Sequence, residues 1–100
     1  MLTQNELNNF LVVLLNFATT LGLSDRAMAE LMGVSNKTMS RWMNAARESD
    51  PQHTVYRHKA KEIANKINYL MPRVDPVALG IRTRGERLQV LKDALASRSV

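Results

Sequence analysis

The sequence predicts an all-α protein, a compact bundle of about five helices that contains a helix-turn-helix. Apolar residues recur at helical spacing in several stretches, and no stretch alternates polar and apolar residues as a strand would. Two capping-box patterns, Thr3 with Glu6 and Thr83 with Glu86, mark helix starts near both ends of the chain. One hundred residues suffice for one hydrophobic core but are marginal for two. We therefore expect a single domain over residues 1–100.

The first helix is expected to follow Thr3 and to run to about Thr20. Its inward residues share a face wider than the stripe of about 100° that is usual for a surface helix. They are Leu7, Phe10, Leu11, Leu14, Leu15, Phe17, Ala18 and Leu21. Val12 and Val13 lie outside this face and add further apolar surface. Either the C-terminal half of the chain or a second subunit must cover the excess, so both valines are candidates for a dimer interface.

Residues 25–44 carry the most specific pattern in the chain. Ser24 can cap a helix through its side-chain oxygen, and Gly33 can end that helix because glycine adopts positive φ at low cost. Ala29, four residues before the glycine, is small enough for a second helix to cross closely. The spacing thus predicts two helices joined by a short turn.

The second helix of this pair is expected over residues 36–46, with Ser35 as its cap. Val34, Met39 and Trp42 would pack it onto the first helix. The methionines of this stretch are interpreted as core residues rather than as a flexible partner groove, and they are Met28, Met32, Met39 and Met43. The outward positions are polar, namely Asn36, Lys37, Thr38, Ser40, Arg41 and Asn44.

Ala29, the run 33–35 and the run 38–42 resemble the Cro/repressor type of helix-turn-helix, which is found in phage repressors and many small bacterial regulators. The resemblance covers residues 25–44 and extends loosely to the preceding helix. It implies that the second helix enters a major groove of DNA. The residues implied as base contacts are Asn36, Lys37 and Arg41, and those implied as phosphate contacts are Ser35, Thr38, Ser40 and Asn44. The plain alternative is a solvated polar face. Asp25 departs from the family, which often has an uncharged phosphate-contacting donor there.

The same resemblance implies a homodimer on a palindromic operator in double-stranded DNA. One recognition helix reads only a few base pairs, so two are needed for useful specificity. The expected function is therefore sequence-specific DNA binding by a transcriptional regulator that represses by occupying its operator. The alternative is a protein-interaction module, such as an antitoxin, an anti-repressor or an adaptor, that keeps a helix-turn-helix scaffold.

The net charge of +5 is unevenly spread along the chain. Residues 1–50 hold four Lys/Arg and five Asp/Glu, giving −1, whereas residues 51–100 hold ten and four, giving +6. A basic balance attracts polyanions such as DNA, although charge also simply keeps a protein in solution. Next to the motif, it favours a nucleic-acid partner.

A loop is expected at residues 48–53, where Pro51 disfavours helix. Thr54 would then cap a helix over residues 54–71, with an apolar stripe that includes Tyr56 and Met71. Cations in its first turns oppose the helix dipole, which suggests that they serve an outside partner. In the resembling family this segment follows the sugar-phosphate backbone. The candidates for phosphate contact are Arg57, Lys59 and Lys61, and the alternative is a solvated basic face that also includes His58.

Asp75 and Pro76 are expected to start a turn or helical stub that ends at Gly80, before a last helix over residues 84–97. Leu88, Leu91 and Leu95 form a narrow seam on that helix, which makes it the first candidate for the dimer interface, ahead of the first helix. Three arginines surround its start. Arg82, Arg84 and Arg87 are open to interpretation as a backbone clamp, a minor-groove arm, partners for acids of another subunit, or a solvated turn.

Enzyme chemistry is not expected. The chain has no cysteine, no Gly-rich phosphate loop and no visible nucleophile with its base. His53 and His58 lack the neighbouring ligands of a metal site, so no metal, cofactor or small-molecule ligand is expected. The apolar run 10–15 is too short to span a bilayer and is wrongly flanked for a signal peptide. We therefore expect a soluble cytoplasmic protein without membrane contact.

Overall fold

The computed structural model describes residues 2–48 and 55–98. Within these residues the chain forms six α-helices and one 3-10 turn, with no strand, so the all-α prediction is confirmed. The elements are α1 Gln4–Leu21, α2 Asp25–Met32, α3 Asn36–Glu48, α4 Arg57–Leu70, η1 Met71–Arg73, α5 Pro76–Gly80 and α6 Arg84–Ser97. The expected stub is α5, which Asp75 caps by accepting a hydrogen bond from the Val77 N–H at 2.9 Å.

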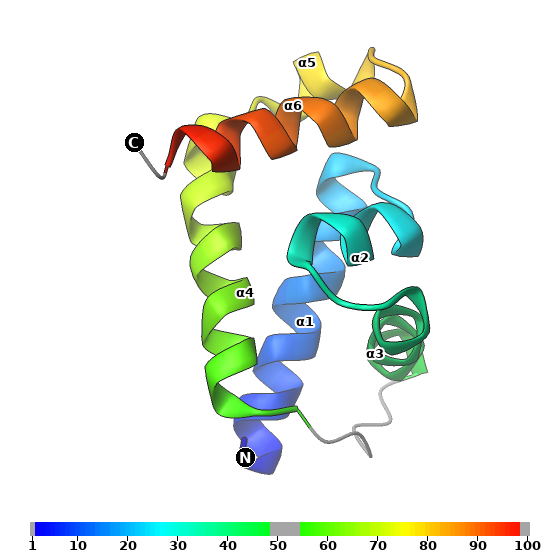
Figure 1. Ribbon diagram of the computed structural model, residues 1–100. Helices are drawn as coiled ribbons and strands as arrows, with labels where there is room; N and C mark the ends of the chain where they lie inside the picture. The colour runs from blue at the N-terminus through cyan, green and yellow to red at the C-terminus, as the bar shows by residue number, and fades with distance from the viewer. Residues whose placement is uncertain (1, 49–54, 99–100) are drawn as a thin grey trace.

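Helix α1 runs through the middle of the bundle (Figure 1). Helices α2 and α3 lie on one side of α1, α4 lies on the other, and α6 crosses the end of the bundle where α1 stops. The core between them is apolar, and none of the described polar or charged residues is buried. Its largest fully buried side chains are Leu14, Phe17, Met28, Met32, Met39, Met43, Ile63, Leu70 and Leu91. The interpretation of the four methionines as core residues is thus confirmed.

The predicted caps determine where the first helices start and stop. The Thr3 hydroxyl accepts the Glu6 N–H at 3.2 Å, and the Glu6 carboxylate accepts the Thr3 N–H at 3.0 Å, which completes the capping box. Ser24 accepts the Ala27 N–H at 3.1 Å and so begins α2. Gly33 ends α2 with φ 72°, in the left-handed region that glycine tolerates best. The helix boundaries around Gly33 are therefore those predicted, while their use in DNA binding remains a prediction.

Helix α4 starts later than expected. It begins at Arg57 with Tyr56 at the N-cap position and no side-chain cap, and Thr54 lies outside the described residues. Tyr56 precedes the helix and is 62% exposed, so it does not belong to the buried stripe. Met71 leaves the stripe for a similar reason, since it lies in the 3-10 turn and is exposed.

The seam on α6 faces the protein's own core. Leu91 is fully buried, and Leu88 and Leu95 are partly buried against the same core. The expectation that these leucines form a dimer interface is wrong for Leu91, because its side chain is already covered by α6's own subunit. Helix α1 keeps its exposed valines, with Val12 56% and Val13 43% exposed.

Arg87 ties the start of α6 to the ends of two other helices. Its guanidinium donates to the carbonyl oxygens of Gly22 at 3.1 Å, Leu79 at 3.1 Å and Gly80 at 2.8 Å. These carbonyls lie at the C-terminal ends of α1 and α5, where the last carbonyls of a helix have no partner in the next turn. Arg87 therefore acts inside the fold, whereas Arg82 lies 3.8 Å from Glu86 and Arg84 is exposed.

No single helix in the described part of the chain is long and apolar enough to cross a membrane. Only α1 and α2 taken together meet the length and composition of a span, and they are bent by 113° relative to each other.

Candidate nucleic-acid interface

Three large side chains on the inward face of α3 fix the orientation of this helix. Met39, Trp42 and Met43 are buried, and the edge of the Trp42 ring meets Phe10 of α1 with centroids 5.5 Å apart. The helical period then turns the predicted contact residues outward. Asn36, Lys37, Arg41 and Asn44 are exposed, and Thr38 and Ser40 are half-buried.

Lys37 and Arg41 lie one turn apart on this face. Within the described residues, neither makes an ion pair or a side-chain hydrogen bond. The acids of the neighbouring helices are occupied elsewhere, since Asp25 pairs with Arg47 and Glu30 pairs with Lys92 at 3.0 Å. Two cations of α3 are therefore available to an outside partner.

Ser35 and Thr38 organise the start of α3. The Ser35 hydroxyl accepts the Thr38 N–H at 3.1 Å and donates to the Thr38 hydroxyl at 2.9 Å. Ser35 is thus the predicted cap, and both functions of its hydroxyl are used within the chain. The Thr38 hydroxyl accepts this bond and keeps its own proton for another acceptor. Of the two predicted phosphate contacts, Thr38 is the better donor.

Four predicted contact residues line one hollow beside α3, which we name the Arg41 hollow. Its volume is about 400 Å³, and it lies between α3 and the start of α4. Its lining comprises Val34, Ser35, Thr38, Arg41, Trp42, Val55, Tyr56 and Lys59. The structure thereby brings Lys59 to α3, although the two are far apart in sequence. Tyr56, which the sequence assigned to the core, is an exposed aromatic ring of this hollow.

Lys59 also supports the turn between α2 and α3. Its Nζ lies 3.5 Å from the Gly33 carbonyl oxygen and 3.5 Å from the Glu62 carboxylate. Lys66, two turns after Lys59 on α4, donates to the Leu31 carbonyl oxygen at 3.4 Å. Burial lowers the pKa of Lys66, and the nearby Glu62 opposes this change. Two cations at the C-terminal end of α2 also complement its dipole.

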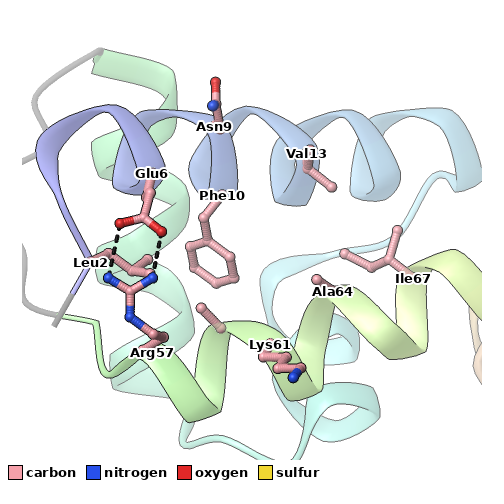
Figure 2. A pocket seen from close by; sticks show the side chains of 10 residues that line it. Leu2, Glu6, Asn9, Phe10, Val13, Arg57, Lys61, Ala64 and Ile67 are labelled. Carbon is pink, nitrogen blue, oxygen red and sulfur yellow. Dashed lines mark hydrogen bonds and ion pairs between the residues drawn. The ribbon is translucent and has the colours of Figure 1, made fainter.

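Arg57 and Lys61 lie away from the Arg41 hollow. They line a mostly apolar groove of about 550 Å³ between α1 and α4 (Figure 2). The Arg57 guanidinium donates to both oxygens of Glu6, at 2.5 and 3.0 Å. These bonds, with the Thr3 N–H, lower the pKa of Glu6 to about 2. The cation that opposed the α4 dipole is thus neutralised within the chain, so the prediction of Arg57 as a phosphate contact loses its motivation.

Arg47 is a residue of this surface that the sequence pattern missed. It donates to Asp25 of α2 and, at 3.1 Å, to the side-chain oxygen of Asn44. Asn44 is therefore held in place by a cation rather than free to rotate. Asn36 lies at the other flank of α3, where it lines a smaller hollow with Arg26, Glu30 and Val34. No local spacing links residues 25 and 47, so only the fold shows their pairing.

Among residues 2–48 and 55–98, no group of three His, Cys, Asp or Glu side chains is close enough to hold a metal ion. His53 lies outside these residues. No protein-family model matches the chain, and no curated protein or solved structure matches it significantly.

Proposed function

We propose that this protein binds double-stranded DNA by placing α3 in the major groove, and that it regulates transcription by occupying an operator. The observation that carries the proposal is the pair Lys37 and Arg41, two exposed cations on an otherwise polar helix face that make no ion pair within residues 2–48 and 55–98. Arginine can bond guanine bidentately in the major groove, and asparagine can do the same with adenine. Asn36, Lys37 and Arg41 are the proposed base contacts.

The Arg41 hollow supports the accompanying backbone contact. Lys59 supplies a cation and Thr38 a hydroxyl proton beside the N-terminal end of α3, where the helix dipole favours negative charge. A phosphate next to α3 would meet these groups together. Backbone contacts of this kind fix the orientation of a recognition helix, and base contacts then supply the specificity.

A homodimer on a palindromic site is the proposed binding form, since one helix of this length reads only a few base pairs. Binding over a promoter would exclude polymerase, which is the simplest way for a DNA-binding domain of this kind to repress. No cofactor is required for such a role.

Selection of bound sequences from a pool of random duplex DNA tests the proposal. The wild type should enrich one motif with two-fold symmetry, and its affinity should fall steeply with salt concentration. The double variant Lys37→Ala/Arg41→Ala should lose the enrichment, whereas Lys61→Ala, which removes one positive charge from α4 away from this face, should keep it. If the wild type enriches nothing and its binding is insensitive to salt, the proposal is wrong.

A second candidate function is a protein-interaction module. The uncharged exposed face of α1, with Val12 and Val13 at its centre, is the observation that favours it. Binding to another protein that is insensitive to salt, without any shift of DNA, would support this alternative.

A further inference from the structure

The exposed face of α1 is unusual for the surface of a cationic protein. Glu6 is the only charged residue of α1, whereas α3, α4 and α6 each carry several charged side chains. After Glu6 along α1, the exposed positions hold only asparagine, threonine and valine. They are Asn8, Asn9, Val12, Val13, Asn16, Thr19 and Thr20. Depletion of charge around an apolar centre is typical of a protein–protein interface.

The order of residues along this face points to a specific partner. Residues 9–16 read Asn-Phe-Leu-Val-Val-Leu-Leu-Asn, which is nearly the same in both directions. When two such helices pack antiparallel about a two-fold axis between Val12 and Val13, position i of one meets position 25 − i of the other. Val12 and Val13 then pack against the same two valines of the second copy, and Asn9 faces Asn16.

We propose that a second copy of this chain docks on this face, with the two α1 helices antiparallel about a two-fold axis between Val12 and Val13. In such an isologous contact, each residue pair occurs twice. The valines bury one another, and the amides of Asn9 and Asn16 can exchange hydrogen bonds because each offers both donors and an acceptor. Further out, Asn5 meets Thr20, so polar residues meet polar residues over the whole helix.

Electrostatics favours the same arrangement over other self-contacts. The chain carries a net charge of +5, so most self-contacts would bring like charges together. The face of α1 avoids that repulsion, and antiparallel packing also sets the two helix dipoles in opposite directions. Figure 2 shows that the Asn9 side chain points away from α4 and that Val13 borders the groove between α1 and α4. The approach of a second helix is therefore not obstructed by α4 on the side where Asn9 points.

The inference does not depend on DNA binding, because the contact can be measured with the protein alone. Sedimentation equilibrium of the wild type, from low-micromolar to sub-millimolar concentration, should show a reversible dimer. Val12→Lys places two like charges beside the axis and should weaken the dimer at least about tenfold. Val77→Lys is the matched control, since Val77 is 79% exposed on α5 and should leave dimerisation unchanged. Asn16→Lys is the second variant if Val12→Lys lowers the melting temperature.

Disulfide trapping tests the orientation, and the absence of natural cysteine makes the result unambiguous. A mixture of the Asn9→Cys and Asn16→Cys proteins should form the mixed disulfide faster than either variant forms its own. Asn9→Cys mixed with Asn68→Cys, which is exposed on α4, is the control and should show no such preference. A monomeric wild type at every concentration overturns the proposal, as does a preference of each cysteine variant for its own kind. DNA selection remains a separate measurement, so the two proposals can fail independently.

Discussion

Arg47 in the last turn of α3 donates to both carboxylate oxygens of Asp25, the first residue of α2, at 2.7 and 3.3 Å. The pair joins the start of one helix of the motif to the end of the other. Each charge also lies at the helix end that the dipole favours, an acid at an N-terminus and a cation at a C-terminus. Asp25, which departs from the resembling family, therefore has a structural partner in this chain.

Removing that acid is expected to affect stability and DNA attraction in opposite directions. Asp25→Ala should lower the free energy of unfolding by about 0.5–1 kcal/mol, as for a partly exposed ion pair. The same change releases Arg47 and removes a negative charge, so binding to random duplex should strengthen. Urea melts and titrations with random DNA measure the two effects. Arg41→Ala is the control for stability and should leave the melt unchanged; an equal loss in both variants would contradict the role of the pair.

The two left-handed glycines should differ in their tolerance of a side chain. Gly33→Val is expected to cost about 1–3 kcal/mol, because valine is strained at its φ of 72°. For alanine substitutions, Gly22→Ala should cost more than Gly33→Ala. A Cβ at Gly22 would lie 2.8 Å from the Arg87 guanidinium, whereas one at Gly33 meets nothing nearer than 4.0 Å. Thermal melts of the two alanine variants decide this, and equal losses would show that Arg87 moves aside without cost.

Acid should weaken the contact between α1 and α4 through Glu6. The folded pKa of Glu6 is about 2, below its ordinary value of 4.5, so its ionised form stabilises the fold. That contribution is complete above pH 4.5 and is lost as the pH falls towards 2. Glu6→Gln and Arg57→Ala should both flatten this part of the curve of unfolding free energy against pH. If the wild type and Arg57→Ala lose stability in parallel over this window, the ion pair is not the cause.

DNA affinities measured over a series of salt concentrations should distinguish base contacts from phosphate contacts. Arg41→Ala is expected to cost about 1–3 kcal/mol on the selected operator and to leave binding to scrambled duplex nearly intact. Lys59→Ala should weaken both and lower the salt slope by about one unit, because Lys59 lies in the Arg41 hollow. Lys61→Ala is the control, since it lines the other groove. Equal weakening of both DNAs by Arg41→Ala would make Arg41 a phosphate contact instead.

Leu91 should behave as a core residue rather than an interface residue. Leu91→Ala is expected to destabilise the protein by about 2–5 kcal/mol, because the side chain is fully buried. Leu91→Asp should unfold it. Circular dichroism at rising protein concentration distinguishes the two roles: core loss is independent of concentration, whereas an interface variant would recover its stability at high concentration.

Local features of the sequence were sufficient for most of the helices. The caps at Thr3 and Ser24 and the end at Gly33 depend on neighbours within a few residues, so the sequence contains all the information needed. The same holds for the inward position of Trp42, which follows from helical spacing. The start of α4 could not be predicted in this way. Thr54 is a plausible cap by residue type alone, whether or not a helix begins next to it.

The pairing of distant side chains could not be obtained from sequence. Arg57 looked like a cation without a local partner, and its partner Glu6 is 51 residues away. Leu91 looked uncovered, because the helices that pack against α6 are α2 and α4, which are distant from it in sequence. Lys59 was expected to meet a phosphate, and the fold adds that it reaches the Gly33 carbonyl and lies beside Arg41. Such relations depend on how the helices pack, which periodicity within one helix does not specify.

The three bonds of Arg87 have a consequence for how the chain folds during synthesis. The contact with Gly22 closes a loop of 65 residues, and α6 also contacts α2 through Lys92 and Glu30. A chain emerging from the ribosome can form α1 to α3 early, yet the Gly22 carbonyl at the end of α1 gains its Arg87 donor only when residue 87 is available. The N-terminal half should therefore remain loosely packed until α6 has left the exit tunnel, and full protection of its amides from hydrogen exchange should arrive in one late step.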